Sequence, residues 1–240
     1  MSSPKNRNAL SLEMLTELTE SFQQLAASGS LNRVIILSAE GPVFSSGHNL
    51  KELTAHYGKE HHKKVFSACT RLMTLIQDIP IPVIAEVGGL ATAAGCQLVA
   101  SCDMVVATDT ARFATPGVSI GLFCSTPAVA LARSLTKRVA LEMALTGEAI
   151  SAEKACLHGL VNKVVPAEEL SSETMNLARK ICSSSAEVIS LGKVCFYQQI
   201  AMDRNQAYDL AEDTMVCNLS LPDGQEGITA FIEKRKPNWQ

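Results

Sequence analysis

The chain has 240 residues, a length within the range of a single α/β domain. Hydrophobic residues make up 47% of it and charged residues 19%, which excludes intrinsic disorder by composition. The formal net charge of -3 gives no basic footprint for nucleic acid. No apolar run approaches the ~18–20 residues that a membrane span requires. We therefore expect a soluble globular protein with no nucleic-acid partner and no membrane span.

The N-terminal part predicts two helices and one buried strand. Apolar residues recur at helical spacing over residues 8–26, and the run at 33–38 is typical of a buried strand. Residues 44–50 are polar and contain a glycine, so we expect a loop there. A second helix pattern covers residues 60–78 and ends before a pair of prolines.

The middle of the chain continues this alternation. A buried strand over 82–87 runs into Gly88 and Gly89, and residues 90–100 are rich in small residues and then become helical. Another strand is predicted over 104–108. Strands that alternate with helices of this length indicate βαβ crossovers and an α/β fold.

Helix patterns dominate from Thr126 onward, interrupted by one short strand over 160–165. No internal repeat, low-complexity tract or linker divides the chain. We predict one domain over residues 1–240, with an α/β core at 1–165 and a helical oligomerisation or lid region at 166–240.

Eight cysteines are present, but none forms a C-x-x-C pair and no group of Cys and His has zinc-ligand spacing. Most lie inside apolar stretches, for example Cys195 and Cys217. We expect small buried side chains in a reducing compartment rather than a disulfide scaffold. No metal site and no separate cofactor is expected.

Two segments can present backbone N–H groups to a ligand. The turn at Gly88 and Gly89 leads to a helix around Gly95, and the first N–H groups of a helix have no intrahelical partner. Tight packing of the helix on the sheet is the commoner reason for such small residues. The second segment is the loop at Gly47 and His48, although a lone loop histidine is usually a surface or hydrogen-bonded residue. No Gly-x-Ser-x-Gly elbow indicates a serine hydrolase.

Beyond these patterns, the chain resembles the crotonase (enoyl-CoA hydratase/isomerase) superfamily over nearly its whole length. Five segments carry the resemblance in chain order: residues 4–10 (PKNRNAL), 44–53 (FSSGHNLKEL), 94–98 (AGCQL) with 102–103, 145–152 (LTGEAISA) and 231–237 (FIEKRKP). The resemblance implies a ββα superhelix whose C-terminal helices build trimers, often paired into hexamers. It also implies a place in mitochondrial fatty-acid metabolism.

The resemblance further implies a site for an acyl-CoA thioester, whose carbonyl oxygen lies between two backbone N–H groups. In this chain those donors are His48 and Ala94. Asn49, Leu50 and Lys51 fall where the family contacts the CoA moiety, which enters as part of the ligand. Because both donors belong to the main chain, the side chains at these positions need not damage the oxyanion hole.

Two departures from the family pattern affect the expected activity. Hydratases place one glutamate where this chain has Gln97 and a second where it has Gly117. Each acid or base group is commonly worth ~10²–10⁴ in rate, so we expect weak or no hydration of enoyl thioesters. Ser125 stands where dienoyl isomerases carry an aspartate, which also disfavours that activity.

Two alternatives stay open. A different reaction on a CoA thioester, decarboxylase-like or isomerase-like, would rely on His48 and Cys124, the only side chains we nominate. A purely structural subunit that joins family oligomers without binding CoA is the other. Family chains usually open with one or two strands before the first motif, whereas Met1 lies close to it here. We expect a short form with an exposed sheet edge and without an import signal.

Overall fold

The structure is a computed structural model that describes residues 1–27 and 31–240. Its strands form two four-stranded sheets, and the first has the order β1-β3-β5-β8 with every neighbouring pair parallel. Its strands are β1 (Ile35–Leu37), β3 (Val83–Val87), β5 (Met104–Thr108) and β8 (Lys163–Val165). All four fall within the segments for which the sequence predicts buried strands.

The second sheet has the order β2-β4-β6-β7, and only β7 is antiparallel to its neighbour. Its strands are β2 (Val43–Ser45), β4 (Leu90–Thr92), β6 (Arg112–Ala114) and β7 (Ile150–Ser151). The sequence analysis missed this sheet. It was wrong to treat residues 44–50 wholly as a loop, because Phe44 and Ser45 lie in β2, and wrong to run residues 90–100 directly into a helix.

Strands β1 to β6 alternate between the two sheets along the chain. The order along the chain is β1, β2, helix α2, then β3, β4, helix α3, then β5 and β6. Because β1, β3 and β5 stack in one sheet and β2, β4 and β6 in the other, each ββα unit lies on the preceding one. This arrangement is the ββα superhelix that the resemblance implies.

The helices largely follow the predicted patterns. Their bounds are α1 (Leu12–Leu25), α2 (Gly58–Asp78), α3 (Ala94–Ser101), α4 (Ser125–Ser134), α5 (Lys137–Thr146), α6 (Ala152–Leu157), α7 (Leu170–Cys182), α8 (Ala186–Gln199), α9 (Arg204–Ser220) and α10 (Pro222–Ile232). Helix α1 begins later than predicted because Arg7 and Asn8 adopt positive φ angles of 52° and 49°. Ser11 then caps the helix by accepting a hydrogen bond from Met14 N at 3.2 Å.

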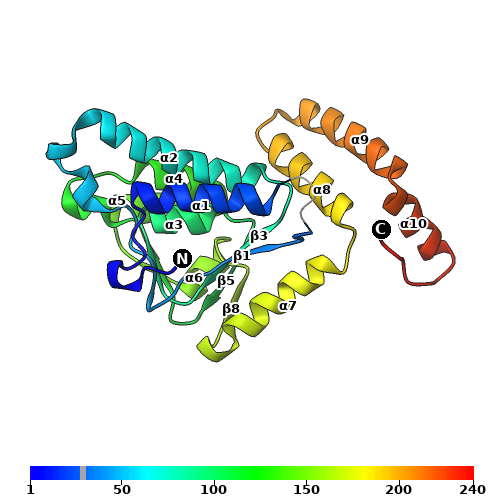
Figure 1. Ribbon diagram of the computed structural model, residues 1–240, viewed down its shortest axis with the longest axis horizontal. Coiled ribbons are helices and arrows are strands. Elements are labelled where there is room, and N and C mark those ends of the chain that lie inside the picture. Colours follow the sequence, from blue (N-terminus) through cyan, green and yellow to red (C-terminus); the bar gives the residue numbers. More distant parts are fainter. Residues whose placement is uncertain (28–30) are drawn as a thin grey trace.

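The hydrophobic core lies between the strands and helices α1, α2 and α3 (Figure 1). Every residue of α3 is buried, because small residues let this helix lie close to the second sheet. At Gly95 an added β-carbon would lie 2.6 Å from Ser45 Cβ in strand β2. Glycine is therefore required for this close approach, and α3 is held in place along its whole length.

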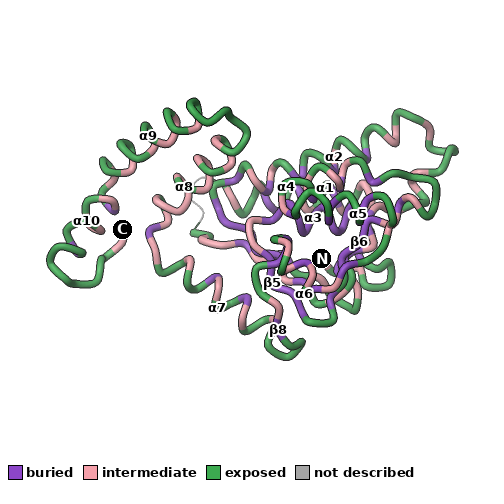
Figure 2. The backbone as a smooth tube through the Cα atoms, turned by 180° about the vertical axis from the view of Figure 1, so that it is seen from behind, coloured by how far each residue is buried: buried purple, intermediate pink, exposed green. Residues whose placement is uncertain are grey.

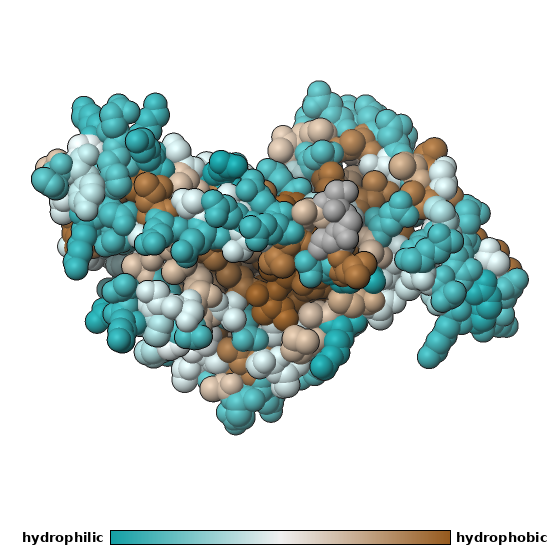
Figure 3. Space-filling model, viewed as in Figure 1, coloured by the Kyte–Doolittle hydropathy of each residue, from teal (hydrophilic) through white to brown (hydrophobic). Residues whose placement is uncertain are grey.

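The last helices extend away from the strands. Helix α7 packs on the first sheet, where Ala178 joins Ile84, Val106 and Val165 in a second small core. Helices α8 and α9 contain no buried residue and project to one side with α10 (Figures 1 and 2). Hydrophobic side chains are visible at the centre of the face shown in Figure 3 and again among these projecting helices.

The cysteines divide into buried and accessible residues, and all eight thiols are free. Four are buried: Cys69, Cys96, Cys102 and Cys124. The prediction of burial is wrong for Cys217, which is exposed on α9, and Cys195 is half-buried on α8. Their apolar neighbours in the sequence lie on helices that pack little against the core of this chain. None of the described helices is long and apolar enough to cross a membrane.

Candidate functional site

The two predicted backbone segments approach each other at Gly47. This residue has φ +82°, and a β-carbon added to it would lie 2.9 Å from Ala93 Cβ and 3.1 Å from Ala94 N. Only glycine satisfies both the conformation and the space. The structure therefore brings the loop before His48 directly against the start of helix α3.

The N-terminal segment fixes the position of this loop. Leu10 N donates to Gly47 O at 2.8 Å, and Asn49 N donates to Leu10 O at 3.4 Å. The Ser45 hydroxyl donates to Asn8 O at 2.8 Å and accepts from Gly47 N at 3.2 Å. These bonds leave the intervening His48 N–H without an acceptor among the residues that the structure describes.

Asn8 and Glu52 support this arrangement, and the sequence analysis missed both. The buried Asn8 amide donates to Glu40 O at 2.9 Å and to Val43 O at 2.8 Å. The Glu52 carboxylate accepts from Leu12 N at 2.9 Å and from the Asn49 side chain at 3.1 Å. Both residues lie within the matched motifs at 4–10 and 44–53, so a signal for them was present.

The start of α3 has an unusual backbone conformation. Ala93 has φ 49° and ψ -120°, and its N–H donates to Ala114 O at 2.9 Å. Ala94 is the first helical residue, and its N–H has no acceptor within residues 1–27 and 31–240. A positive φ is uncommon for a residue other than glycine, and such strain clusters at functional sites.

Gln97 lies one turn further along the same helix and is 5% exposed. Its side-chain oxygen Oε1 accepts from the Cys69 thiol on helix α2 at 4.0 Å. Burial raises the pKa of Cys69 to about 12, so this thiol stays protonated at neutral pH. Cys69 was not predicted as a site residue, because nothing in the sequence links it to a position 28 residues away.

Gly117 lies in the 3₁₀ helix η4 (Pro116–Ile120), and the space beside it is filled. A β-carbon added there would lie 2.5 Å from Leu122 O and 2.8 Å from Cys124 Sγ. Burial raises the pKa of the Cys124 thiol, and no contact in the described structure joins it to His48. Ser125 is exposed, and its hydroxyl donates to Phe123 O at 3.4 Å.

The His48 side chain packs against helix α2. Its ring lies edge-on to Phe66 with centroids 5.0 Å apart, and Nδ1 lies 3.4 Å from Leu10 O. Burial lowers the pKa of His48, while the Leu10 carbonyl and the Glu52 charge act in the opposite direction. His48 is therefore neutral at pH 7, and its Nε2 is buried without a partner in the described part of the chain.

The three residues expected to contact CoA lie at the start of the next short helix, η2 (Leu50–Leu53). The Asn49 side chain caps this helix by accepting from Lys51 N at 3.3 Å. Leu50 and Lys51 are exposed. Leu50 and Lys51 are thus available to a ligand, whereas the side chain of Asn49 is engaged within the protein.

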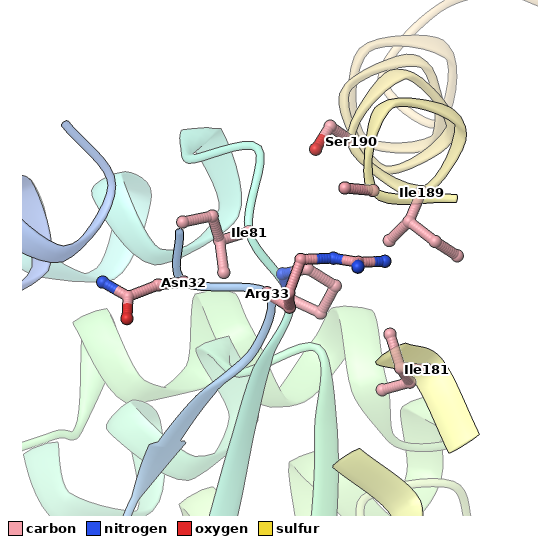
Figure 4. A pocket seen from close by; sticks show the side chains of 8 residues that line it. Asn32, Arg33, Ile81, Ile181, Ile189 and Ser190 are labelled. Atoms are coloured by element: carbon pink, nitrogen blue, oxygen red, sulfur yellow. The ribbon is translucent and has the colours of Figure 1, made fainter. Parts of the chain in front are cut away.

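A small cavity of about 20 Å³ lies elsewhere, between the start of β1 and helices α7 and α8 (Figure 4). Its lining shares no residue with the two loops: Asn32, Arg33, Ile81, Pro82, Ile181, Ala186, Ile189 and Ser190. It holds about one water molecule and is too small for an acyl-CoA. Among the described residues, no three His, Cys, Asp or Glu side chains are grouped so that they could hold a metal ion.

Comparison with known proteins identifies the family. The family model described as enoyl-CoA hydratase/isomerase matches residues 1–240. The mitochondrial enoyl-CoA hydratase domain-containing protein 3 of Xenopus laevis is 61% identical over 239 residues, which cover 100% of this chain and 81% of that protein. Its Homo sapiens counterpart, also named mitochondrial, is 60% identical and covered to 78%. These names support the expected mitochondrial localisation.

Solved structures agree with the sequence comparisons. The crystal structure of the human enoyl-CoA hydratase domain-containing protein 3 has a TM-score of 0.96 at 60% identity, with 99% of this chain and 93% of that chain covered. The fold predicted from the motifs is thereby confirmed. The chain belongs to the enoyl-CoA hydratase/isomerase family, the crotonase superfamily that its motifs resemble.

Proposed function

We propose that the chain binds acyl-CoA thioesters and holds the thioester carbonyl oxygen between the backbone N–H groups of His48 and Ala94. The observation that carries this proposal is the close approach at Gly47, where an added β-carbon would lie 3.1 Å from Ala94 N. Two amides that have no acceptor among the described residues thus belong to backbone segments in direct contact. Membership of a family that acts on CoA thioesters supports the same ligand class.

Such a pair of donors suits a carbonyl oxygen that gains negative charge. Each donor aimed at a developing oxyanion contributes about 3–4 kcal/mol of transition-state stabilisation. The bond from Leu10 N to Gly47 O and the bond from Gly47 N to the Ser45 hydroxyl hold the first donor segment, and the bond from Ala93 N to Ala114 O holds the second. Both backbone segments are therefore held by the protein itself, which supports a preformed pair of donors.

We further propose that hydration of enoyl thioesters is weak or absent. Gln97 cannot transfer a proton near neutral pH, and Gly117 has no side chain. Leu122 O and Cys124 Sγ occupy the space beside Gly117. A carboxylate from a neighbouring residue therefore cannot enter this space, where the hydratase glutamate would lie, unless these atoms move. The expected role is acyl-CoA binding in mitochondrial lipid metabolism, with a reaction other than efficient hydration if one is catalysed.

Titration calorimetry with acetyl-CoA tests the binding proposal. We expect saturable heat with the wild-type chain and a large loss of affinity in Gly47→Ala, whose new methyl group meets Ala93 and Ala94. The matched control is Gly58→Ala, since Gly58 also has a positive φ of 71° but has nothing within 4 Å of an added β-carbon. No heat with the wild-type chain contradicts the proposal and favours the structural subunit.

Hydration of crotonyl-CoA tests the activity. A rate within about tenfold of an ordinary hydratase contradicts the loss of acid–base chemistry. A reaction that uses other side chains is tested with malonyl-type thioesters and His48→Ala. An unchanged rate in that variant removes the His48 side chain from the mechanism.

We also propose a homotrimer or a hexamer. Helices α8 and α9 contain no buried residue, although they carry large hydrophobic side chains. Those exposed by more than half are Phe196, Tyr208, Met215 and Val216, and Ile200, directly after α8, is equally exposed. Burial against further copies would remove this apolar surface from water. Light scattering coupled to gel filtration should give three or six times the chain mass of 25.7 kDa, and a monomer contradicts the proposal.

A further inference from the structure

Gln97 has an unused hydrogen-bond donor within the candidate site. The side chain is 5% exposed, and its oxygen accepts from the Cys69 thiol. Its amide nitrogen Nε2 donates to no acceptor in the described structure, yet it is not among the polar atoms sealed from solvent, as His48 Nε2 is. A nearly buried amide with one end paired and the other open is arranged to meet a ligand.

The Cys69 thiol determines which end of the amide is open. It is 1% exposed, and it remains an S–H donor at neutral pH because burial disfavours its thiolate. A thiol donor pairs with the amide oxygen rather than with the NH₂ group. Cys69 therefore holds the amide oxygen of Gln97 and leaves the two N–H bonds of Gln97 Nε2 available to another acceptor.

The position of Gln97 on α3 directs its amide toward the proposed thioester site. Side chains on a helix lean toward its N-terminus, and residues three apart lie on one face. Gln97 follows Ala94 by three residues, so its amide leans toward the end of the helix where the Ala94 N–H is free. In the proposed binding mode, a thioester that accepts from that N–H has the acyl carbons next to its carbonyl group close to this end of the helix.

We infer that the site prefers acyl-CoA thioesters with an acceptor oxygen on the third acyl carbon, the 3-oxoacyl class, because Gln97 Nε2 donates to that oxygen. This inference rests on the proposed function. A ketone oxygen only accepts hydrogen bonds, which matches the NH₂ group that Cys69 leaves open. Saturated and 2-enoyl chains have no such oxygen, so their binding desolvates Nε2 without pairing it.

Competitive calorimetry with three four-carbon thioesters tests the preference. We expect acetoacetyl-CoA to bind about tenfold to a hundredfold more tightly than butyryl-CoA or crotonyl-CoA, the factor that leaving one buried donor unpaired costs. In Gln97→Met, which keeps the size of the side chain but removes the donor, the preference should vanish while the affinity for butyryl-CoA is kept.

Cys69 is expected to act as a positioning residue. Cys69→Ala should reduce the preference, and Cys69→Ser, which retains a donor, should restore it. The control is Cys102→Ala, because the buried Cys102 thiol donates to Leu98 O at 3.3 Å at the far end of the same helix. This control should keep the wild-type ratio.

The possible outcomes separate the two proposals. If none of the three thioesters binds, the proposed function itself fails. If all three bind the wild-type chain with equal affinity, acyl-CoA binding stands and the 3-oxoacyl preference is overturned. A preference that survives in Gln97→Met also overturns the role of Gln97.

Discussion

Lys193 of helix α8 donates to Asp103 Oδ2 at 2.6 Å, and this ion pair joins the C-terminal helices to the strand core. Lys193 also donates to Ile76 O at 2.8 Å and to Ile81 O at 2.9 Å. Its side chain is 7% exposed and that of Asp103 is 12% exposed. The Lys193 side chain thus connects α8 to the end of α2, the start of β3 and the start of β5.

Lys193→Met should therefore destabilise the protein strongly. Removing one partner of a buried ion pair leaves the other charge uncompensated and costs about 3–5 kcal/mol. Urea denaturation should record this loss, and Asp103→Asn should recover part of it in the double variant. In the control Lys154→Met, which breaks an exposed pair with Glu142, the loss should stay below about 1 kcal/mol. Equal losses would contradict the assigned role.

The burial of His48 predicts a specific dependence of stability on pH. Burial lowers its pKa below the usual 6.5, so at mildly acidic pH the unfolded chain binds a proton that the folded chain does not. The free energy of unfolding should then decrease as the pH falls below about 6.5 and level off below the folded pKa. His48→Gln should lose less stability over this range than the wild type. The exposed-site control His56→Gln should behave as the wild type does; identical profiles for all three proteins would refute the prediction.

The buried strands of the first sheet could be predicted because they are continuous apolar runs. Strands such as Val83–Val87 lie in the core, and their residues are accordingly almost all apolar. The second sheet could not be predicted, because its strands of two or three residues do not lie within longer apolar runs, as the equally short β1 does. Leu90–Thr92 includes Ala91 and follows two glycines, and it becomes a strand only through pairing with β2 and β6. Long-range pairing of this kind leaves no local signal.

The candidate site could likewise be predicted from the sequence only in part. Its glycines mark unusual backbone, but the contact of Gly47 with Ala93 and Ala94 joins segments that lie far apart in the sequence. Composition and spacing alone therefore left two separate loops, and only the resemblance paired His48 with Ala94. The positive φ of Ala93 could not be predicted either, since alanine favours helix.

Restoring the hydratase glutamates should not restore hydration. Gln97→Glu keeps the shape of the side chain, but Gly117→Glu places a β-carbon 2.5 Å from Leu122 O, which belongs to the backbone and cannot rotate away. We expect the double variant to lose about 1–3 kcal/mol of stability and to gain little crotonyl-CoA hydration. Gly192→Glu on α8 is the control, since nothing lies within 4 Å of its added β-carbon. A double variant with full stability and high activity would contradict the steric argument.

Glu52 should govern the order of the loop that carries the His48 amide. Its carboxylate joins Leu12 N, at the start of α1, to the Asn49 side chain, and hydrogen bonds to a charged group contribute about 1.5–3 kcal/mol. Glu52→Ala should speed amide hydrogen exchange over residues 46–50 and weaken acetyl-CoA binding. Glu60→Ala, at an exposed position on α2, is the control and should change neither. If exchange accelerates while affinity is unchanged, this loop does not bind the thioester. If neither changes, Leu10 and Ser45 fix the loop without Glu52.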